Sequence, residues 1–240
     1  MERSLHRQLK QRYGPEVGGR SEVVVGDFRI DAIAPDGRLI EIQAGPLGRL
    51  RGKLGRLLPS CAVGVVKPVV VGRRIVRRDR RTGAELGARR SPKRGSVVDV
   101  FDELVALARI FPDPNLRLDV LAVEVDEVRV ARRRRPGYEV VDQILTGIVR
   151  AVRLREGDDL WALLPAGLPA RFTTAELAES LDRPVDFARR VAYCLLHAGA
   201  AEVVAKAGNR QVYARSFAEP IGIRTSVALG GRPGPEMVAG

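Results

Sequence analysis

The chain has 240 residues, enough for one large domain or two small ones, and 45% of them are hydrophobic, enough to form folded cores. No apolar run approaches the roughly 20 residues of a membrane span, and the first residues lack the apolar core of a signal peptide. Two isolated cysteines, Cys61 and Cys194, indicate neither a disulfide framework nor a zinc site. We therefore expect a cytoplasmic protein with no membrane partner.

The formal net charge of +12 lies entirely in the first part of the chain. Residues 1–137 contain 29 Lys and Arg against 17 Asp and Glu, whereas residues 138–240 contain 12 of each. The segment 67–94 alone contains 11 basic and 2 acidic residues. Such a segment attracts the phosphates of nucleic acid, although the solvated surface of an arginine-rich protein would have the same composition.

Helix and strand patterns alternate along the first part of the chain, and the spacing of apolar residues separates them. We predict, in chain order, a helix at 2–13, strands at 21–25, 27–33 and 39–43, a helix at 47–58, strands at 62–66 and 69–71, a basic hairpin at 73–95, a helix at 97–111 and a strand at 116–125. This succession predicts an α/β domain over residues 1–136, with a mixed central sheet flanked by helices.

The hairpin formed by residues 28–43 carries the chemistry that a metal site would need. Pro35-Asp36-Gly37 predicts its turn, since proline sets φ and glycine accepts positive φ. Asp31 lies in the first strand, and Glu41 and Gln43 share one face of the second because side chains alternate along a strand. Two carboxylates and an amide that converge would suit Mg²⁺ or Mn²⁺, which prefer oxygen ligands.

Four arginines at 132–135 precede Pro136-Gly137, where we place a domain boundary. The second domain, 138–216, contains predicted helices at 139–155, 159–164, 174–181 and 185–198 and predicted strands at 201–206 and 211–215. Thr173 and Glu176 form a capping box for one of these helices. This order predicts a winged-helix domain, followed by a disordered tail at 217–240 that is rich in Gly and Pro.

The order of these N-terminal elements and acids carries a family resemblance. The segment 1–130 resembles the PD-(D/E)xK, or restriction-endonuclease-like, nuclease superfamily, in which a helix carries a glutamate, a following strand the first acid, and the next strand a (D/E)-x-K motif. The resemblance implies that Glu2 is the helix glutamate, Asp31 the first acid, and Glu41-Ile42-Gln43 the second motif. The segments 2–10 and 29–45 are also similar to a bacterial group that joins such a domain to a winged helix.

One position departs from the family pattern, because Gln43 replaces the lysine and cannot supply its charge. Some members of the superfamily use glutamine there, and in others a basic residue of the next helix takes over, for which Lys53 and Arg49 are the candidates. Alternatively, the site has decayed and the domain is an inactive scaffold. His6 could hydrogen-bond a site acid or be purely structural.

The resemblance implies metal-dependent hydrolysis of phosphodiester bonds in nucleic acid, DNA above all, with Asp31 and Glu41 holding the metal. The alternative is an inactive nuclease fold that acts as a DNA-binding or regulatory protein. The predicted nucleic-acid contacts are Arg49, Arg73, Arg74, Arg77, Arg78, Arg183, Arg189, Arg190, Lys206 and Arg210. The winged helix could instead serve dimerisation or intramolecular packing, and cutting both strands of a duplex would ordinarily require a homodimer.

Overall fold

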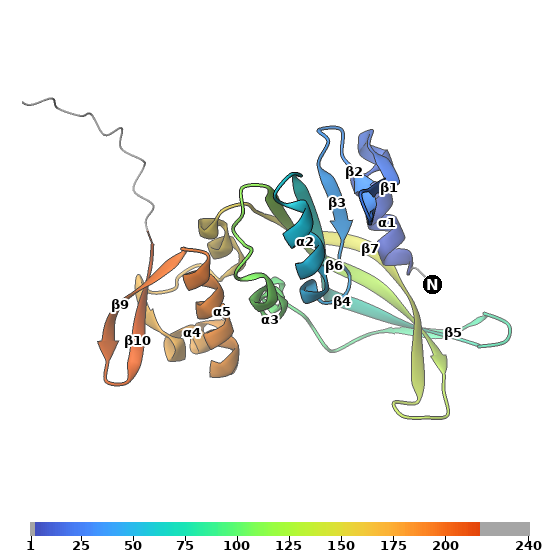
Figure 1. The fold of residues 1–240 in the computed structure, drawn as a ribbon. Coiled ribbons are helices and arrows are strands. Elements are labelled where there is room, and N and C mark those ends of the chain that lie inside the picture. The colour runs from blue at the N-terminus through green and yellow to red at the C-terminus, as the bar shows by residue number, and fades with distance from the viewer. Residues whose placement is uncertain (1–2, 217–240) are drawn as a thin grey trace, which may run out of the picture.

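The computed structural model describes residues 3–216 of the chain, and Figure 1 shows their fold. Glu2, predicted as the helix glutamate of the site, and residues 217–240, predicted as a disordered tail, lie outside the described residues. Within the described range no helix is both long enough and apolar enough to cross a membrane.

The first part of the described chain alternates helices and strands. Its elements in chain order are α1 (Ser4–Tyr13), η1 (Pro15–Val17), β1 (Arg20–Val25), β2 (Phe28–Ile33), β3 (Leu39–Ile42), η2 (Leu47–Leu50), α2 (Arg51–Leu57), β4 (Val63–Arg78), β5 (Glu85–Arg90), η3 (Val97–Val100), α3 (Phe101–Leu104), η4 (Val105–Leu107), β6 (Leu116–Ala131) and β7 (Tyr138–Leu154). The three predicted N-terminal strands are confirmed as β1, β2 and β3. The two predicted valine-rich strands are one long strand, β4, and the helix predicted at 97–111 is divided into the short turns η3, α3 and η4.

The strands form one mixed sheet in the order β1-β2-β3-β4-β6-β7, with β5 paired to the distal half of β4. β1, β2 and β3 are antiparallel neighbours, whereas β4 runs parallel to both β3 and β6. A parallel pair needs a crossover connection, and η2 and α2 provide it between β3 and β4. The predicted mixed α/β architecture with a large central sheet is therefore confirmed.

Helices cover both faces of this sheet, because the residues of β3 alternate between two apolar clusters. Ile40 packs with Leu9 of α1 on one face. Leu39 belongs to the cluster on the other face, together with Leu54 of α2 and Phe101 of α3. Burying a side chain of this size stabilises the fold by about 1.5–3 kcal/mol, so β3 is held between α1 and α2.

The segment 139–155 is a strand, so the helix predicted there is wrong. It forms β7, which pairs antiparallel with β6 over almost its whole length. Three register irregularities interrupt the β6–β7 ladder, and each one breaks the alternation of inward and outward residues that identifies a strand in sequence. The valines and isoleucines of this segment favour a strand once a long partner is present.

The boundary predicted at Pro136-Gly137 falls in the hairpin turn between β6 and β7. Arg132 N donates to Gly137 O at 3.0 Å, and Gly137 N donates to Arg134 O at 2.9 Å. Gly137 has φ +84°, a value that favours glycine. The four arginines therefore form a hairpin tip, and the first sheet continues to Leu154 instead of ending before residue 138.

The second part of the described chain contains η5 (Gly157–Leu163), β8 (Arg171–Thr173), α4 (Thr174–Leu181), α5 (Val185–His197), β9 (Ala201–Ala207) and β10 (Arg210–Arg215). The last three strands form a small sheet in the order β8-β10-β9. The predicted capping box is confirmed, because the Thr173 side chain accepts a hydrogen bond from Glu176 N while Glu176 accepts one from Thr173 N at 2.7 Å.

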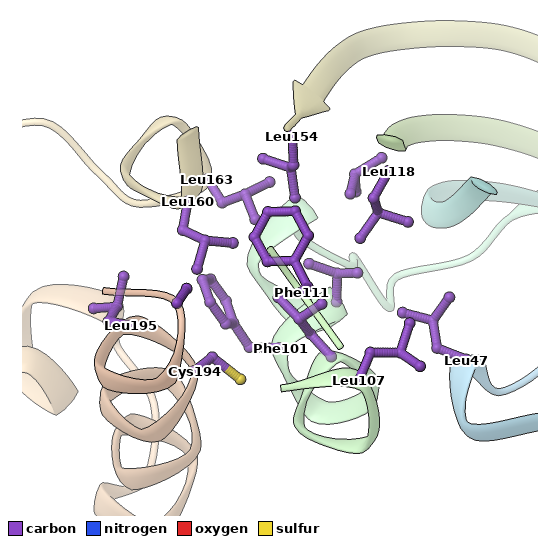
Figure 2. Packing of buried hydrophobic residues seen from close by; sticks show 14 of the residues in the cluster. Leu47, Phe101, Leu107, Phe111, Leu118, Leu154, Leu160, Leu163, Cys194 and Leu195 are labelled. Carbon is purple, nitrogen blue, oxygen red and sulfur yellow. The ribbon is translucent and has the colours of Figure 1, made fainter. Parts of the chain in front are cut away.

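A single apolar cluster joins the two parts of the chain. Figure 2 shows Phe101 and Phe111 of the first part beside Leu160 and Leu163 of η5 and Leu195 of α5. Each of these side chains is at most 3% exposed. Because no solvated gap separates the two parts here, they share one core.

Candidate functional site

The regular β2–β3 ladder ends where the two predicted acids lie. Its last pair is Ala32 opposite Ile40, and Asp31 and Glu41 lie just beyond the point where this regular pairing stops. The Asp31 carboxylate accepts a hydrogen bond from Ile42 N at 2.8 Å, and the Glu41 carboxylate accepts one from the Asp31 backbone N–H. Each carboxylate thus accepts a hydrogen bond from the backbone of the neighbouring strand, in place of a backbone carbonyl.

The pKa values of the two acids shift in opposite directions. Burial raises the pKa of Glu41, which is 7% exposed, and the neighbouring Asp31 charge raises it further, against the lowering effect of Lys53. Burial also acts to raise the pKa of Asp31, but hydrogen bonds from His6 and from the Ile42 backbone outweigh it, so this pKa is lowered. Asp31 is therefore the stronger acid and Glu41 the more basic carboxylate.

Lys53, one of the two predicted substitutes for the motif lysine, reaches the site from α2. Its Nζ lies 2.5 Å from Glu41 Oε1 and also donates to Arg29 O at 2.7 Å. The side chain is 17% exposed. The structure therefore places a positive charge directly on the second acid.

Gln43 and Arg49 do not contact the acids in the structure. Gln43 Nε2 donates to Pro46 O at 2.8 Å, just before η2, and Gln43 N donates to Val66 O at 2.9 Å. Both side chains border Gly45, where an added Cβ would lie 3.3 Å from Gln43 Nε2 and 3.6 Å from Arg49 Nη1. Gln43 thus stabilises the loop that leads from β3 into η2.

Helix α1 contributes two further side chains to the Asp31 end of the site. His6 Nε2 lies 3.3 Å from Asp31 Oδ2, which is one of the alternatives that the sequence left open for His6. Lys10, one turn later, contributes to lowering the pKa of Asp31 and lies 2.9 Å from Glu22 Oε1. The sequence signal for Lys10 was its i,i+4 spacing from His6, which places both on one helix face.

Glu22 has an unusual backbone conformation at this site. Its φ is +56°, a region that non-glycine residues rarely adopt. The β1–β2 register, with Ser21 opposite Ala32 and Val23 opposite Ile30, places Glu22 across from Asp31. Strain of this kind costs about 1–3 kcal/mol and clusters at functional sites.

The four arginines predicted as nucleic-acid contacts on the basic hairpin fall into two pairs. Arg73 Nη1 and Arg74 Nε lie 3.4 and 2.9 Å from acidic side chains of β6. Arg77 and Arg78 are exposed, and no carboxylate of residues 3–216 pairs with either of them. The second pair is therefore the one available to a phosphate.

The second part of the chain uses two of its predicted contacts for internal packing. Arg183 Nη2 and Arg190 Nε lie 2.8 and 2.7 Å from aspartates of η3 and α3. Arg189 pairs with an aspartate one turn earlier in α5, at 2.6 Å. Lys206 and Arg210 are exposed on the β9–β10 hairpin. The face of α5 that carries Arg190 thus packs against α3.

The donor set of the site is two carboxylates and one imidazole. Residues 3–216 contain no group of three or more His, Cys, Asp or Glu side chains close enough to hold a metal ion. Asp31 and Glu41 supply carboxylate oxygens, the type of donor preferred by Mg²⁺, which binds through one or two carboxylates and retains several water ligands. The oxygen donors match a hard cation, whereas the lone His6 does not form a site for zinc.

The fold and the site define a mixed α/β protein in which a buried, lysine-paired Glu41 lies on the strand next to a half-buried Asp31. The chain belongs to the family described as "Domain of unknown function (DUF8091)", whose model matches residues 3–155. It is also 33% identical over 184 residues to a protein of Treponema pallidum (strain Nichols) described as "Uncharacterized protein", a match that covers 75% of this chain and 72% of the relative. No solved structure matches it. The family match extends to the end of β7, in agreement with the extent of the first sheet.

Proposed function

We propose that this protein hydrolyses phosphodiester bonds of nucleic acid, DNA above all, with Mg²⁺ or Mn²⁺ held by Asp31 and Glu41. One observation carries the proposal: two acids on adjacent strands each accept a hydrogen bond from the backbone of the other strand, with Lys53 Nζ 2.5 Å from Glu41. The order α1, β1–β3, α2 and β4 supports a restriction-endonuclease-like fold, because the acids lie on two successive strands after a helix.

A metal ion bound by the two carboxylates would lower the pKa of a water molecule and stabilise charge on the phosphate oxygens. Lys53 provides the positive charge that Gln43 lacks, next to where charge develops on the phosphate. His6 orients Asp31 by its hydrogen bond.

The test is a cleavage assay on supercoiled, linear, branched and single-stranded DNA and on RNA, with Mg²⁺ or Mn²⁺ and with chelator. We expect Asp31→Asn and Glu41→Gln to abolish cleavage, because each removes a negatively charged metal ligand. Glu202→Ala, an exposed acid on β9, is the matched control and retains full activity. Cleavage that survives in both site variants would reject the proposal.

The alternative function is an inactive nuclease fold that binds or regulates DNA. The observation that favours it is that Gln43, at the position of the motif lysine, donates to Pro46 O and has no contact with the acids. In that case the wild-type chain would bind nucleic acid and cleave none of the substrates above.

The second part of the chain supports a winged helix, because η5, β8, α4, α5 and the β9–β10 hairpin follow one another in that order. Since α5 packs against α3, we propose that this module serves intramolecular packing rather than DNA contact. We further propose a cytoplasmic location, and a homodimer if both strands of a duplex are cut.

A further inference from the structure

Two neighbouring hairpins hold most of the net charge of the protein. Residues 72–94, at the β4–β5 hairpin, and residues 126–139, at the β6–β7 hairpin, together contain 15 Lys and Arg against 5 Asp and Glu, a net +10 of the total +12. We call this region the basic arm; in Figure 1 it lies on the side of the molecule opposite the second part of the chain. Arg80 Nη2 and Glu139 Oε2, 2.5 Å apart, connect the two hairpins.

Most cations of the basic arm are exposed and have no internal partner. Among residues 3–216, no carboxylate pairs with Arg77, Arg78, Arg81, Arg89, Arg90, Lys93, Arg94, Arg132, Arg133, Arg134 and Arg135. These unpaired, exposed charges are therefore available to a polyanion.

The basic arm also contains an apolar groove, which simple phosphate binding does not require. It has a volume of about 560 Å³ and is bordered by β4, β5, β6 and the turn that leads to β7. Leu86, 59% exposed, and Tyr138 belong to its apolar lining, and Arg77, Arg78 and Arg89 also line it. The groove therefore combines an apolar surface with cations.

The aromatic ring of the groove is held in place by its neighbours. The Arg129 guanidinium carbon lies 3.8 Å from the centroid of the Tyr138 ring, and Arg129 Nη2 lies 2.5 Å from Glu127 Oε1. Because Glu127 is buried, this arrangement fixes the guanidinium and the ring before any ligand binds. A fixed planar surface is what stacking of a nucleobase needs.

We infer that the basic arm binds single-stranded polynucleotide, with bases against Leu86 and Tyr138 and phosphates on the surrounding arginines. A duplex keeps its bases stacked inside and would leave the apolar groove unused, whereas a single strand exposes both bases and phosphates. DNA and RNA share this chemistry. The inference therefore names single-stranded nucleic acid, or a single-stranded end, as the substrate class.

This inference rests on the proposed function where it links the basic arm to cleavage. β4 is continuous from Val65, paired with Glu41, to Arg78 in the basic arm. At about 3.3 Å per residue, the groove lies roughly 40 Å along the strand from the acid pair. The basic arm extends beyond the end of β3 that carries Glu41. A polynucleotide bound to the arm would therefore run toward the acid pair.

The experiment measures binding by the full chain in chelator, by fluorescence anisotropy, to single-stranded DNA, single-stranded RNA and duplex DNA of about 20 nucleotides. Leu86→Ser and Tyr138→Ala remove apolar contact, Arg77→Ala with Arg78→Ala removes two cations, and Arg171→Ala is the control. Arg171 is exposed on β8 and has no carboxylate partner among residues 3–216. Thermal unfolding establishes that each variant is folded.

We expect the wild type to bind both single strands at least tenfold more tightly than duplex. Tyr138→Ala should weaken single-strand binding about tenfold and Leu86→Ser should weaken it measurably, with duplex binding unchanged. The double arginine variant should reduce the slope of log affinity against log salt by about 1.4. Leu86→Ser changes an exposed side chain, so the test stands even if Tyr138→Ala unfolds.

Duplex binding as tight as single-strand binding, or groove variants that bind like the wild type, would overturn the inference. So would an effect of Arg171→Ala as large as that of the arginine pair. The cleavage assay on the wild type, run beside this binding assay, separates the two proposals. Single-strand binding without any cleavage rejects only the proposed function, and cleavage without single-strand preference rejects only this inference.

Discussion

Lys53 Nζ lies 2.5 Å from Glu41 Oε1, so a side chain of α2 neutralises an acid of the central sheet. The two side chains are 17% and 9% exposed. A buried carboxylate is costly unless it is paired and hydrogen-bonded. The ion pair therefore explains how Glu41 is tolerated between Ile40 and Ile42, and it connects the stability of the fold to the geometry of the site.

Lys53→Met should destabilise the protein by about 3 kcal/mol, because it leaves the Glu41 carboxylate buried and unpaired. In a Glu41→Gln background the same substitution should cost at least about 1 kcal/mol less, since no charge then remains to be paired. Urea denaturation of the wild type, both single variants and the double variant measures this coupling. Additive effects in the cycle would show that the pair contributes nothing.

The two acids should have opposite effects on stability as the pH changes. The folded pKa of Asp31 lies below 3.8, so its contribution stabilises the fold above that pH and is lost as the pH falls through the folded pKa. The folded pKa of Glu41 lies above 4.5, so its contribution favours the fold below that pH and is lost as the pH rises through the folded pKa.

The measurement is the free energy of unfolding of the wild type, Asp31→Asn and Glu41→Gln between about pH 3 and pH 7. From acid to neutral pH, the advantage of the wild type over Asp31→Asn should grow, and its advantage over Glu41→Gln should shrink. The same sign of slope for both variants would contradict the assigned directions.

Leu195→Ala should destabilise the whole protein by about 2–5 kcal/mol, because Leu195 is fully buried in the core that both parts share. Trp161, the only tryptophan, reports on the second part of the chain, whereas far-UV circular dichroism reports on the helices and strands of both parts. The two transitions should coincide and move together to lower denaturant concentration. Independent domains would instead give a Trp161 transition that no longer coincides with the transition seen by circular dichroism.

Gly55→Ala should stabilise the protein by about 0.5–1 kcal/mol. Gly55 lies within α2, and an added Cβ there meets no atom within 4 Å, so alanine gains helix propensity without a clash. Gly157→Ala is the matched contrast, because its Cβ would lie 1.9 Å from Ala198 O and must displace the backbone. Thermal unfolding of both variants should shift in opposite directions.

Arg183→Ala with Arg190→Ala should leave nucleic-acid affinity unchanged, because both side chains pair with aspartates of η3 and α3. Both pairs are substantially exposed, so we expect a stability loss below about 1 kcal/mol for each. Anisotropy titration of the double variant beside the Arg77→Ala, Arg78→Ala variant tests this. If the double variant loses as much affinity as the Arg77→Ala, Arg78→Ala variant, DNA contact would be assigned to α5.

Local sequence determined the parts of the protein whose geometry depends on neighbouring residues. The turn between Asp31 and Glu41 formed as predicted, with Gly37 at φ +83° and Ala34 N donating to Arg38 O at 2.9 Å. The helix start at Thr173 followed its capping box in the same way. These elements were predictable because the backbone preferences and hydrogen bonds that form them act within a few residues.

Tertiary structure decided the partners that lie far apart in the sequence. β7 became a strand because β6 offered it a long edge, although its apolar spacing favoured a helix. The meeting of Glu41 with Lys53, and of Asp31 with His6 and Lys10, depends on how α1 and α2 pack on opposite faces of the sheet. The sequence alone determined the acid hairpin and the basic charge. Only packing decided which cations face which acids, because burial and pairing energies depend on the whole fold.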